Sequence, residues 1–186
     1  MPWDLQIAIF ITSTLLLLYV SRASLLRPRS HGFFRFFAWE AIVSLALLNA
    51  AAWFRRWLSW SQLVSWLLLL ISLIPLGLGV DGLRRGGQAD RKARGNIELM
   101  PFERTTKLVT VGIFRYIRHP MYGSLLLLAW GLFFKDPSWA GAALASAATL
   151  SLVLTAQADE AECIGAFGDE YRNYMRRTRM FIPYVF

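Results

Sequence analysis

Cysteine and histidine are scarce in this 186-residue chain, which holds one Cys and two His. A single thiol, Cys163, can form neither an internal disulfide nor a thiolate metal cluster. We interpret it as a small buried or interfacial residue. Internal repeats and low-complexity tracts are also absent from the sequence, so the chain is treated as a single domain over residues 1–186.

Charged residues are few for a protein of this size, at 17%, whereas hydrophobic residues make up 56%, including eight Trp and thirteen Phe. This composition is too apolar for an ordinary soluble domain. Several apolar runs approach the ~20 residues that a helix needs to cross the hydrocarbon core of a bilayer. The sequence therefore predicts an all-α membrane bundle of about five transmembrane helices with a cytosolic helical extension at the carboxy terminus. The predicted spans are residues 5–20, 36–54, 63–80, 122–134 and 139–156, of which the first and fourth are short.

Acidic residues are outnumbered by basic ones, 12 against 20, for a net charge of +8. In a soluble protein this excess would suggest a nucleic-acid partner, but here its distribution follows membrane topology, and we expect no nucleic acid. Only Arg55, Arg56 and Lys135 fall on the opposite side of the predicted membrane from the others. The positive-inside rule then predicts an outside amino terminus, a cytoplasmic tail and residence in the cell (inner) membrane. The basic residues of the predicted inner side are Arg22, Arg27, Arg29, Arg35, Arg84, Arg85, Arg91, Lys92, Arg94, Arg104, Lys107, Arg115, Arg118, Arg172, Arg176, Arg177 and Arg179.

A basic segment and a cleavage site are both missing around the first apolar run, so we expect a retained span rather than a signal peptide. The longest loop, residues 81–118, contains an apolar stretch at 97–102, which we expect to pack against the membrane-facing core. The formal glycine pattern of dinucleotide-binding loops at residues 77–82 follows an apolar helix rather than a strand, and it carries almost no weight without its structural context.

The fourth span is too short, because thirteen helical residues rise only about 20 Å against a hydrocarbon core of about 30 Å. If this helix began near Ile113, Pro120 would kink it and place His119 at the kink. At the other end, Asp136 and Pro137 are typical of a helix start, with Asp as the cap. Spans four and five would then form a tight hairpin.

The fifth span carries a small-residue stripe, Gly141, Ala145 and Ala148, which predicts close approach of a neighbouring helix. We expect the helix to continue through Gln157 into the cytosolic extension, whose apolar face would lie against the inner rim of the bundle and cover a cavity. That face consists of Ile164, Phe167, Tyr171 and Tyr174.

Two motifs carry most of the functional information. Residues 108–122 read Leu-Val-Thr-Val-Gly-Ile-Phe-Arg-Tyr-Ile-Arg-His-Pro-Met-Tyr, and the later part of the chain holds Glu160, then Phe-Gly-Asp-Glu-Tyr at 167–171, Tyr174 and Ile182-Pro183. Together they resemble the signature of isoprenylcysteine carboxyl methyltransferases and related integral membrane methyltransferases, including the phospholipid methyltransferases. The resemblance covers the chain from Thr106 onward.

The resemblance implies an enzyme that uses S-adenosyl-L-methionine in a cytosol-facing pocket and methylates a lipophilic acceptor arriving from the bilayer. It needs no metal. The implied catalytic residues are His119, Glu160 and Arg115. The implied cofactor-binding residues are Leu108, Val109, Gly112, Tyr116, Arg118, His119, Pro120, Tyr122, Glu160 and Glu162.

The side chains named by the resemblance suit that cofactor chemically, because it carries a sulfonium, a carboxylate, a ribose and an adenine. Glu160 could accept from ribose hydroxyls or balance positive charge, Arg115 or Arg118 could hold the carboxylate, and Tyr116, His119 or Tyr122 could contact adenine.

Each of these assignments has a structural alternative. The arginines could extend to the lipid interface, His119 could be a helix-boundary residue, and Glu160 with Glu162 could form a solvated helix end. Asp159 stands where the family usually has Glu, so its role stays open. Glu40 and Asn49, in the second span, could line an acceptor tunnel or form hydrogen bonds between helices.

The function most in line with the resemblance is carboxyl methylation of an isoprenylcysteine-type substrate. Two alternatives also use methyl transfer: methylation of a phospholipid head group and methylation of a small hydrophobic thiol. A lipid ammonium would have to lose a proton, and so would need a base such as His119. Reduction with NADPH, by analogy with membrane sterol reductases, and a non-catalytic protein that binds lipids or a partner are the two other classes. The expected partners are a lipophilic or lipidated substrate and membrane lipids.

Overall fold

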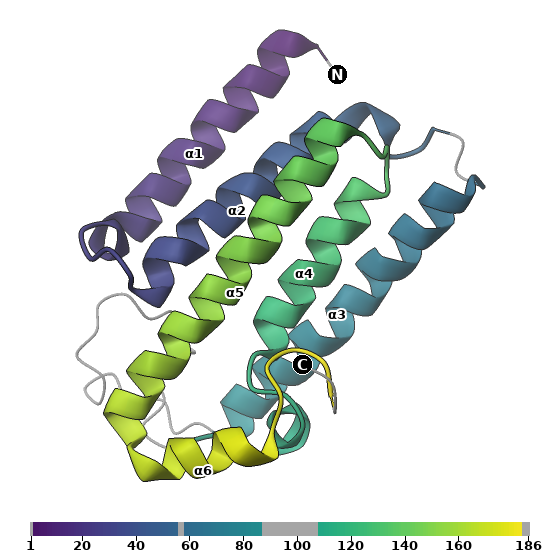
Figure 1. Cartoon of the computed structure of the whole chain (residues 1–186). Helices are drawn as coiled ribbons and strands as arrows, with labels where there is room; N and C mark the ends of the chain where they lie inside the picture. The colour runs from purple at the N-terminus through teal and green to yellow at the C-terminus, as the bar shows by residue number, and fades with distance from the viewer. Residues whose placement is uncertain (1, 56–57, 87–107, 184–186) are drawn as a thin grey trace.

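The computed structural model describes residues 2–55, 58–86 and 108–183, and the apolar stretch 97–102 lies outside them. Over these residues the chain forms α-helices and two short 3-10 helices, so the predicted all-α fold is confirmed (Figure 1). The helices are α1 (Trp3–Leu25), α2 (His31–Leu48), η1 (Ala50–Ala52), α3 (Trp60–Gly86), η2 (Gly112–Arg115), α4 (Pro120–Phe133), α5 (Trp139–Phe167) and α6 (Asp169–Arg177).

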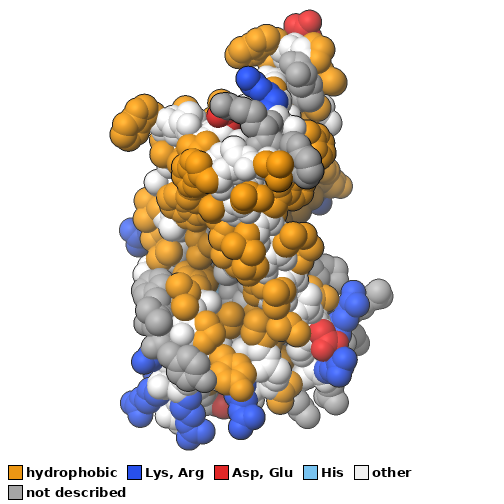
Figure 2. Space-filling model, turned by 90° about the vertical axis from the view of Figure 1, so that its right-hand side faces the viewer, with side chains coloured by type: hydrophobic (Ala, Val, Ile, Leu, Met, Phe, Trp, Pro, Cys, Tyr) orange, Lys and Arg blue, Asp and Glu red, His pale blue; other side chains and the backbone are white. Residues whose placement is uncertain are grey.

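Four of these helices, α1, α2, α3 and α5, are long and apolar enough to cross a membrane, which identifies the chain as a membrane protein. The remaining helix of the bundle, α4, has only 14 residues and corresponds to the short fourth span of the sequence. The five helices run side by side in the order α1, α2, α5, α4, α3 (Figure 1). Figure 2 shows a broad hydrophobic band on one face, with Lys and Arg gathered at the end where α6 lies.

The core lies where α2, α4 and α5 meet. Leu45 of α2, Ala129 of α4, and Ala145 and Ala148 of α5 are fully buried there. Gly141 is also buried, and a Cβ on it would come within 3.7 Å of Leu45, so the small residues of α5 do allow the predicted close approach. Helix α1 packs against α2, and only serines are buried along it.

Polar side chains join neighbouring helices inside the bundle. Thr14 of α1 donates a hydrogen bond to Glu40 of α2 at 3.1 Å, and the Asn49 amide donates to the Leu132 carbonyl at 2.8 Å. Glu40 and Asn49 therefore both make the hydrogen bonds between helices that were one of their two expected roles. Buried Lys135 donates to the side-chain oxygen Oε1 of Gln62 at 3.1 Å.

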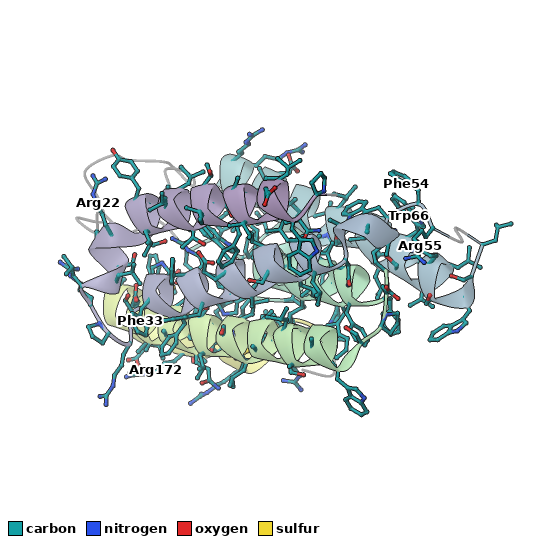
Figure 3. All side chains as sticks on the ribbon, turned by 90° about the horizontal axis from the view of Figure 1, so that it is seen from above. Arg22, Phe33, Phe54, Arg55, Trp66 and Arg172 are labelled. Carbon is teal, nitrogen blue, oxygen red and sulfur yellow. The ribbon has the colours of Figure 1, made fainter. Side chains whose placement is uncertain are left out.

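The two ends of the bundle differ in side-chain chemistry. The Lys135 ammonium lies 3.5 Å from the centroid of the Trp66 ring, so its charge is held by a neutral aromatic face rather than a carboxylate. Figure 3 places Phe54, Arg55 and Trp66 together at this end, and Arg22, Phe33 and Arg172 at the opposite end. The end marked by Arg22, Phe33 and Arg172 is also where α6 lies.

Two expected helix starts are wrong. Helix α4 does not begin near Ile113: it begins at Pro120, with His119 in the capping position, so Pro120 produces no kink. Proline is favoured at the first helical position, because its missing N–H would have no intrahelical partner there. Similarly, α5 is capped by Ser138, whose hydroxyl accepts from the Gly141 N–H at 3.1 Å, and not by Asp136.

Glycines on α3 let the segment before α4 approach closely. A Cβ on Gly79 would lie 3.1 Å from Pro120, and one on Gly82 would lie 3.0 Å from the Phe114 ring. Both glycines belong to the stretch with the formal dinucleotide-binding pattern, which is entirely helical. These glycines therefore serve packing, and they fix where Phe114 and Pro120 lie against α3.

Candidate functional site

A buried charge cluster connects the start of α4 with the end of α5. The Arg118 Nε donates to Glu160 Oε1 at 2.6 Å, and His119 Nε2 lies 3.2 Å from the same oxygen. The Arg118 and Glu160 side chains are only 9% and 10% exposed. A carboxylate this deeply buried needs such partners, because desolvation of an unpaired charge is very costly.

The tail of the chain closes this cluster from the other side. Arg118 N–H donates to the Arg179 carbonyl at 2.8 Å, His119 N–H donates to the Met180 carbonyl at 3.1 Å, and Arg179 N–H donates back to Tyr116. The Arg118 Nη1 also donates to the Thr178 carbonyl at 2.6 Å. Arg118 thus joins the segment before α4, the end of α5 and the tail in one hydrogen-bonded unit.

The carboxy-terminal extension bends at Gly168 instead of continuing as one helix. Gly168 has φ of 58°, a conformation that favours glycine, and α6 starts at the next residue. Tyr171 and Tyr174 of α6 pack with Cys163 of α5, and burial raises the pKa of both tyrosines. The protonated Tyr174 hydroxyl donates to the Phe114 carbonyl at 2.6 Å, which anchors α6 to the segment before α4.

A pocket of about 740 Å³, counted to its open mouth, lies beneath this extension. Aromatic and apolar side chains, among them Phe114, Phe167 and Tyr171, form most of its wall. Small-molecule sites are likewise concave and largely apolar with a few polar groups. Six of the residues expected to bind the cofactor line it: Leu108, Val109, Arg118, His119, Pro120 and Tyr122.

The other expected site residues lie at different places. Glu160 sits behind the pocket wall, in contact with Arg118 and His119. Arg115 and Tyr116 line a separate hollow, together with residues of the tail. Gly112 has φ of 61° in η2, and a Cβ on it would meet nothing within 4 Å.

One pocket residue, His31, was not expected from the sequence. Its side chain is 1% exposed and lines the pocket from the first turn of α2. Glu162 Oε2 accepts from His31 Nδ1 at 2.8 Å, and Glu162 Oε1 accepts from the His31 backbone N–H at 3.1 Å. The only sequence signal for it is that the chain holds just two histidines.

Asp159 also lines the pocket. Its Oδ2 lies 3.6 Å from His119 Nδ1, and its Oδ1 lies 3.7 Å from the Cys163 sulfur. The side chain is 22% exposed, more than that of Glu160. The Asp159 carboxylate therefore lies at the pocket surface, whereas the Glu160 carboxylate lies inside the wall and contacts Arg118 and His119.

These groups suit a ligand that combines a positive charge, hydroxyl groups and a flat ring. The His119 and Tyr122 rings stack with centroids 5.4 Å apart and planes 16° apart, which provides a flat surface. Asp159 can accept from hydroxyls or face a cation. S-adenosyl-L-methionine has each of these parts, so the residues present fit this cofactor.

Comparisons with known proteins find relatives of the part of the chain that holds most of these residues. Residues 95–166 match the model of the phospholipid methyltransferase family. Over 81 residues, 42% of this chain, the sequence is 31% identical to a methanethiol S-methyltransferase of Crocosphaera subtropica. Over 129 residues, 68% of this chain, it is 23% identical to a methanethiol S-methyltransferase of Pseudomonas deceptionensis.

These alignments span 30% and 43% of the relatives' own lengths, so they compare part of each relative with this chain. No solved structure matches the chain. The matched region includes the charge cluster and the pocket residues from Leu108 to Cys163. The resemblance of the carboxy-terminal half to the integral membrane methyltransferases is thereby confirmed, with the phospholipid methyltransferase family and the methanethiol S-methyltransferases as its relatives.

Proposed function

We propose that this protein transfers a methyl group from S-adenosyl-L-methionine to a small lipophilic acceptor at the cytosolic face of the membrane. The observation that carries the proposal is the pocket beneath α6, where an apolar wall meets His119, Arg118 and Asp159. Methyl transfer is an in-line displacement, favoured chiefly by positioning the two reactants and by excluding water. A mostly apolar pocket favours both conditions.

The bound cofactor would supply an electrophilic methyl group, and the chain would supply its placement. In this proposal the stacked His119 and Tyr122 rings receive the adenine, and Asp159 receives hydroxyls or the positive charge. Glu160 acts from behind, because its contacts with Arg118 and His119 hold both side chains against the pocket. Arg115 lines a different hollow, so its expected catalytic role has no support from its position.

The acceptor that we favour is a small hydrophobic thiol, because the relatives carry the name methanethiol S-methyltransferase. The apolar pocket wall suits such a substrate. Carboxyl methylation of an isoprenylcysteine-type substrate and methylation of a phospholipid head group are the competing outcomes within the same chemistry, the latter in line with the name of the matching family.

We further propose that the amino terminus lies outside and the tail in the cytoplasm, in the cell membrane of a bacterium. Arg22 and Arg172 lie at the same end of the bundle, as the positive-inside rule requires for a cytoplasmic side (Figure 3). The pocket would then open towards the compartment that holds S-adenosyl-L-methionine.

Binding of the two candidate cofactors by purified protein tests this proposal. We expect S-adenosyl-L-methionine to bind in calorimetry and NADPH not to bind. Incubation with cofactor and a set of thiols, isoprenylcysteines and membrane lipids should then give a methylated thiol by mass spectrometry. Binding of NADPH alone would support reduction instead, and no product from any acceptor would favour a non-catalytic protein.

A single substitution tests the role of Glu160. We expect Glu160→Gln to weaken cofactor binding strongly, because Arg118 and His119 lose the negative charge that holds them. The matched control is Asp169→Asn, since Asp169 is 86% exposed at the start of α6 and should bind the cofactor like the unmodified protein. If Glu160→Gln bound the cofactor with unchanged affinity, Glu160 would not belong to the cofactor site.

A further inference from the structure

His31 is a buried histidine with one ring nitrogen left unused. Its Nε2 is buried and has no hydrogen-bond partner among the residues that the structure describes. A buried polar atom without a partner costs free energy, and native proteins retain few of them. Because His31 also lines the pocket, a ligand in that pocket is the natural partner for this nitrogen.

Glu162 fixes which ring nitrogen is available. A carboxylate only accepts hydrogen bonds, so His31 Nδ1, at 2.8 Å from Glu162 Oε2, must carry a hydrogen. The second Glu162 oxygen accepts from the His31 backbone, so both contacts hold the ring in one orientation. In the neutral imidazole the lone pair is then on Nε2.

We propose that His31 is the general base that accepts a proton from a protic acceptor, and that Glu162 is its positioning residue. This inference rests on the proposed methyl transfer and narrows the acceptor to a group that must lose a proton, such as a thiol. An acceptor that is already a carboxylate anion would need no such base. The sequence motifs do not include His31, which comes from the part of the chain outside the family match.

The proposed step balances as follows. The thiol S–H bond breaks, the proton moves to His31 Nε2, and the freed sulfur electron pair forms a bond to the methyl carbon. The bond between that carbon and the sulfonium sulfur breaks, and its electron pair stays on the sulfur, which becomes neutral. The positive charge thus passes to the His31 imidazolium, which Glu162 stabilises through the Nδ1 hydrogen bond.

Three charged groups act on His31. Glu162 and Asp159 lie on α5, and Arg35 lies one turn further along α2. The two carboxylates favour the imidazolium and the guanidinium opposes it. A pH profile of the unmodified enzyme would therefore reflect all four residues and not His31 alone. The decisive experiment instead compares acceptors of different acidity.

The first test compares two thiols in His31→Gln. With a weakly acidic alkanethiol, we expect kcat to fall about 100-fold, the size typical of a lost general base. With a strongly acidic aryl thiol, which is already ionised, we expect kcat to change little. Cofactor binding should stay unchanged, and the control Arg22→Gln, an exposed residue at the same end of the bundle, should behave like the unmodified enzyme.

An equal loss with both thiols, or no loss with either, would overturn the proposed base. If the unmodified protein bound the cofactor but methylated only a carboxylate, the thiol acceptor of the proposed function would fail, and the need for a base would fail with it. Weakened cofactor binding in His31→Gln would show a structural role instead.

The second test does not depend on turnover. The chain has only two histidines, so protein labelled with nitrogen-15 in histidine gives two pairs of ring-nitrogen signals, one Nδ1 and one Nε2 signal for each histidine, and His119→Gln assigns the pairs. We expect a protonated Nδ1 and a bare Nε2 for His31, and a change of the Nε2 signal when alkanethiol is added. An unprotonated Nδ1, or an Nε2 signal that does not change when the thiol is added, would contradict the proposal even if the unmodified enzyme were inactive.

Discussion

At the scale of single residues, Arg118 connects more of the site than any other side chain described above. Its Nε bonds to Glu160 while its Nη1 bonds to the Thr178 carbonyl, both at 2.6 Å. The planar guanidinium holds these donors on separate nitrogens in a fixed fork, whereas all three donors of a lysine ammonium sit on one nitrogen. The geometry of the cluster therefore depends on arginine itself and not only on positive charge.

Arg118→Lys tests this dependence. We expect a loss of about 1.5–3 kcal/mol in the free energy of unfolding, the range for a hydrogen bond to a charged group. Thermal unfolding in detergent measures the loss, and faster proteolysis of residues 178–183 would locate it in the tail. Arg172→Lys is the control, since the Arg172 side chain is 60% exposed. Equal stability of the two variants would contradict the account.

The buried tyrosines of α6 predict loss of stability at alkaline pH. Burial raises the pKa of Tyr174 and Tyr171 above the ordinary value of 10.0. The folded protein therefore holds these protons more tightly than the unfolded chain, so their contribution is complete below about pH 10 and is lost as the pH rises further. We expect the free energy of unfolding, measured by denaturant titration, to be level from neutral pH to about pH 10 and to fall above it.

Tyr174→Phe separates the two tyrosines. The variant should lose about 1–3 kcal/mol at neutral pH, because the Phe114 carbonyl loses its donor. Its alkaline decline should be shallower than that of the unmodified protein but still present, since Tyr171 remains. A decline that is unchanged in steepness would show that Tyr174 does not contribute to it.

The motif residues of the site could be expected from the sequence, but their grouping could not. The sequence motif predicted four cofactor-binding residues that line one pocket in the structure: Leu108, Val109, His119 and Tyr122. His31 was missed because its partner, Glu162, is 131 residues away, and no local pattern links two such positions.

At the scale of elements, the close approach of α3 to the segment before α4 predicts a contrast between two glycines. In Gly82→Ala the new Cβ would lie 3.0 Å from the Phe114 ring, which lines the pocket. We expect a loss of about 1–3 kcal/mol from overpacking, together with weaker cofactor binding. Thermal unfolding and calorimetry measure the two effects.

Gly77→Ala is the matched control, because its Cβ would meet nothing within 4 Å on the same helix. Alanine in a helix is favoured over glycine by roughly 0.5–1 kcal/mol, so this variant should be as stable as the unmodified protein or slightly more stable. If both variants lost stability alike, steric contact with Phe114 would not be the cause.

Helix existence was predictable here, whereas helix starts were not. The apolar runs indicate α1 to α5, including the short α4, because each is rich in residues that lipid accepts. The start of α4 depends on the pairing of residues 116–119 with the tail, which ends the preceding segment before a helix can form. The sequence predicted Asp136 as the cap of α5, whereas the Ser138 hydroxyl accepts from the Gly141 N–H and caps the helix two residues later.

At the scale of the whole molecule, the basic end of the bundle predicts its orientation in the membrane. We expect a fluorescent protein fused after the last residue to be active in the cytoplasm and alkaline phosphatase fused there to be inactive. Fusions in the loop that carries Arg55, at the opposite end, should give the reverse result. The same result at both positions would contradict a bundle that spans the membrane as proposed.

The class of the whole fold could be read from composition and from the length of the apolar runs, because bilayer thickness limits what can cross it. The order of helices in space could not. All five are apolar on several faces. The small residues of α5 set its close packing against α2 and α4, and the buried hydrogen bond of Asn49 to Leu132 joins the end of α2 to α4.

The pairing of the tail with residues 116–119 has a consequence for biosynthesis. Membrane helices enter the bilayer in the order of translation, so α1 to α5 can be inserted before residues 178–181 leave the ribosome. Until those residues arrive, the Arg118 guanidinium lacks its Thr178 acceptor and the His119 N–H lacks the Met180 carbonyl. A nascent chain halted at that stage would be anchored in the membrane but would lack the hydrogen bonds that fix Arg118 and His119 in the pocket wall.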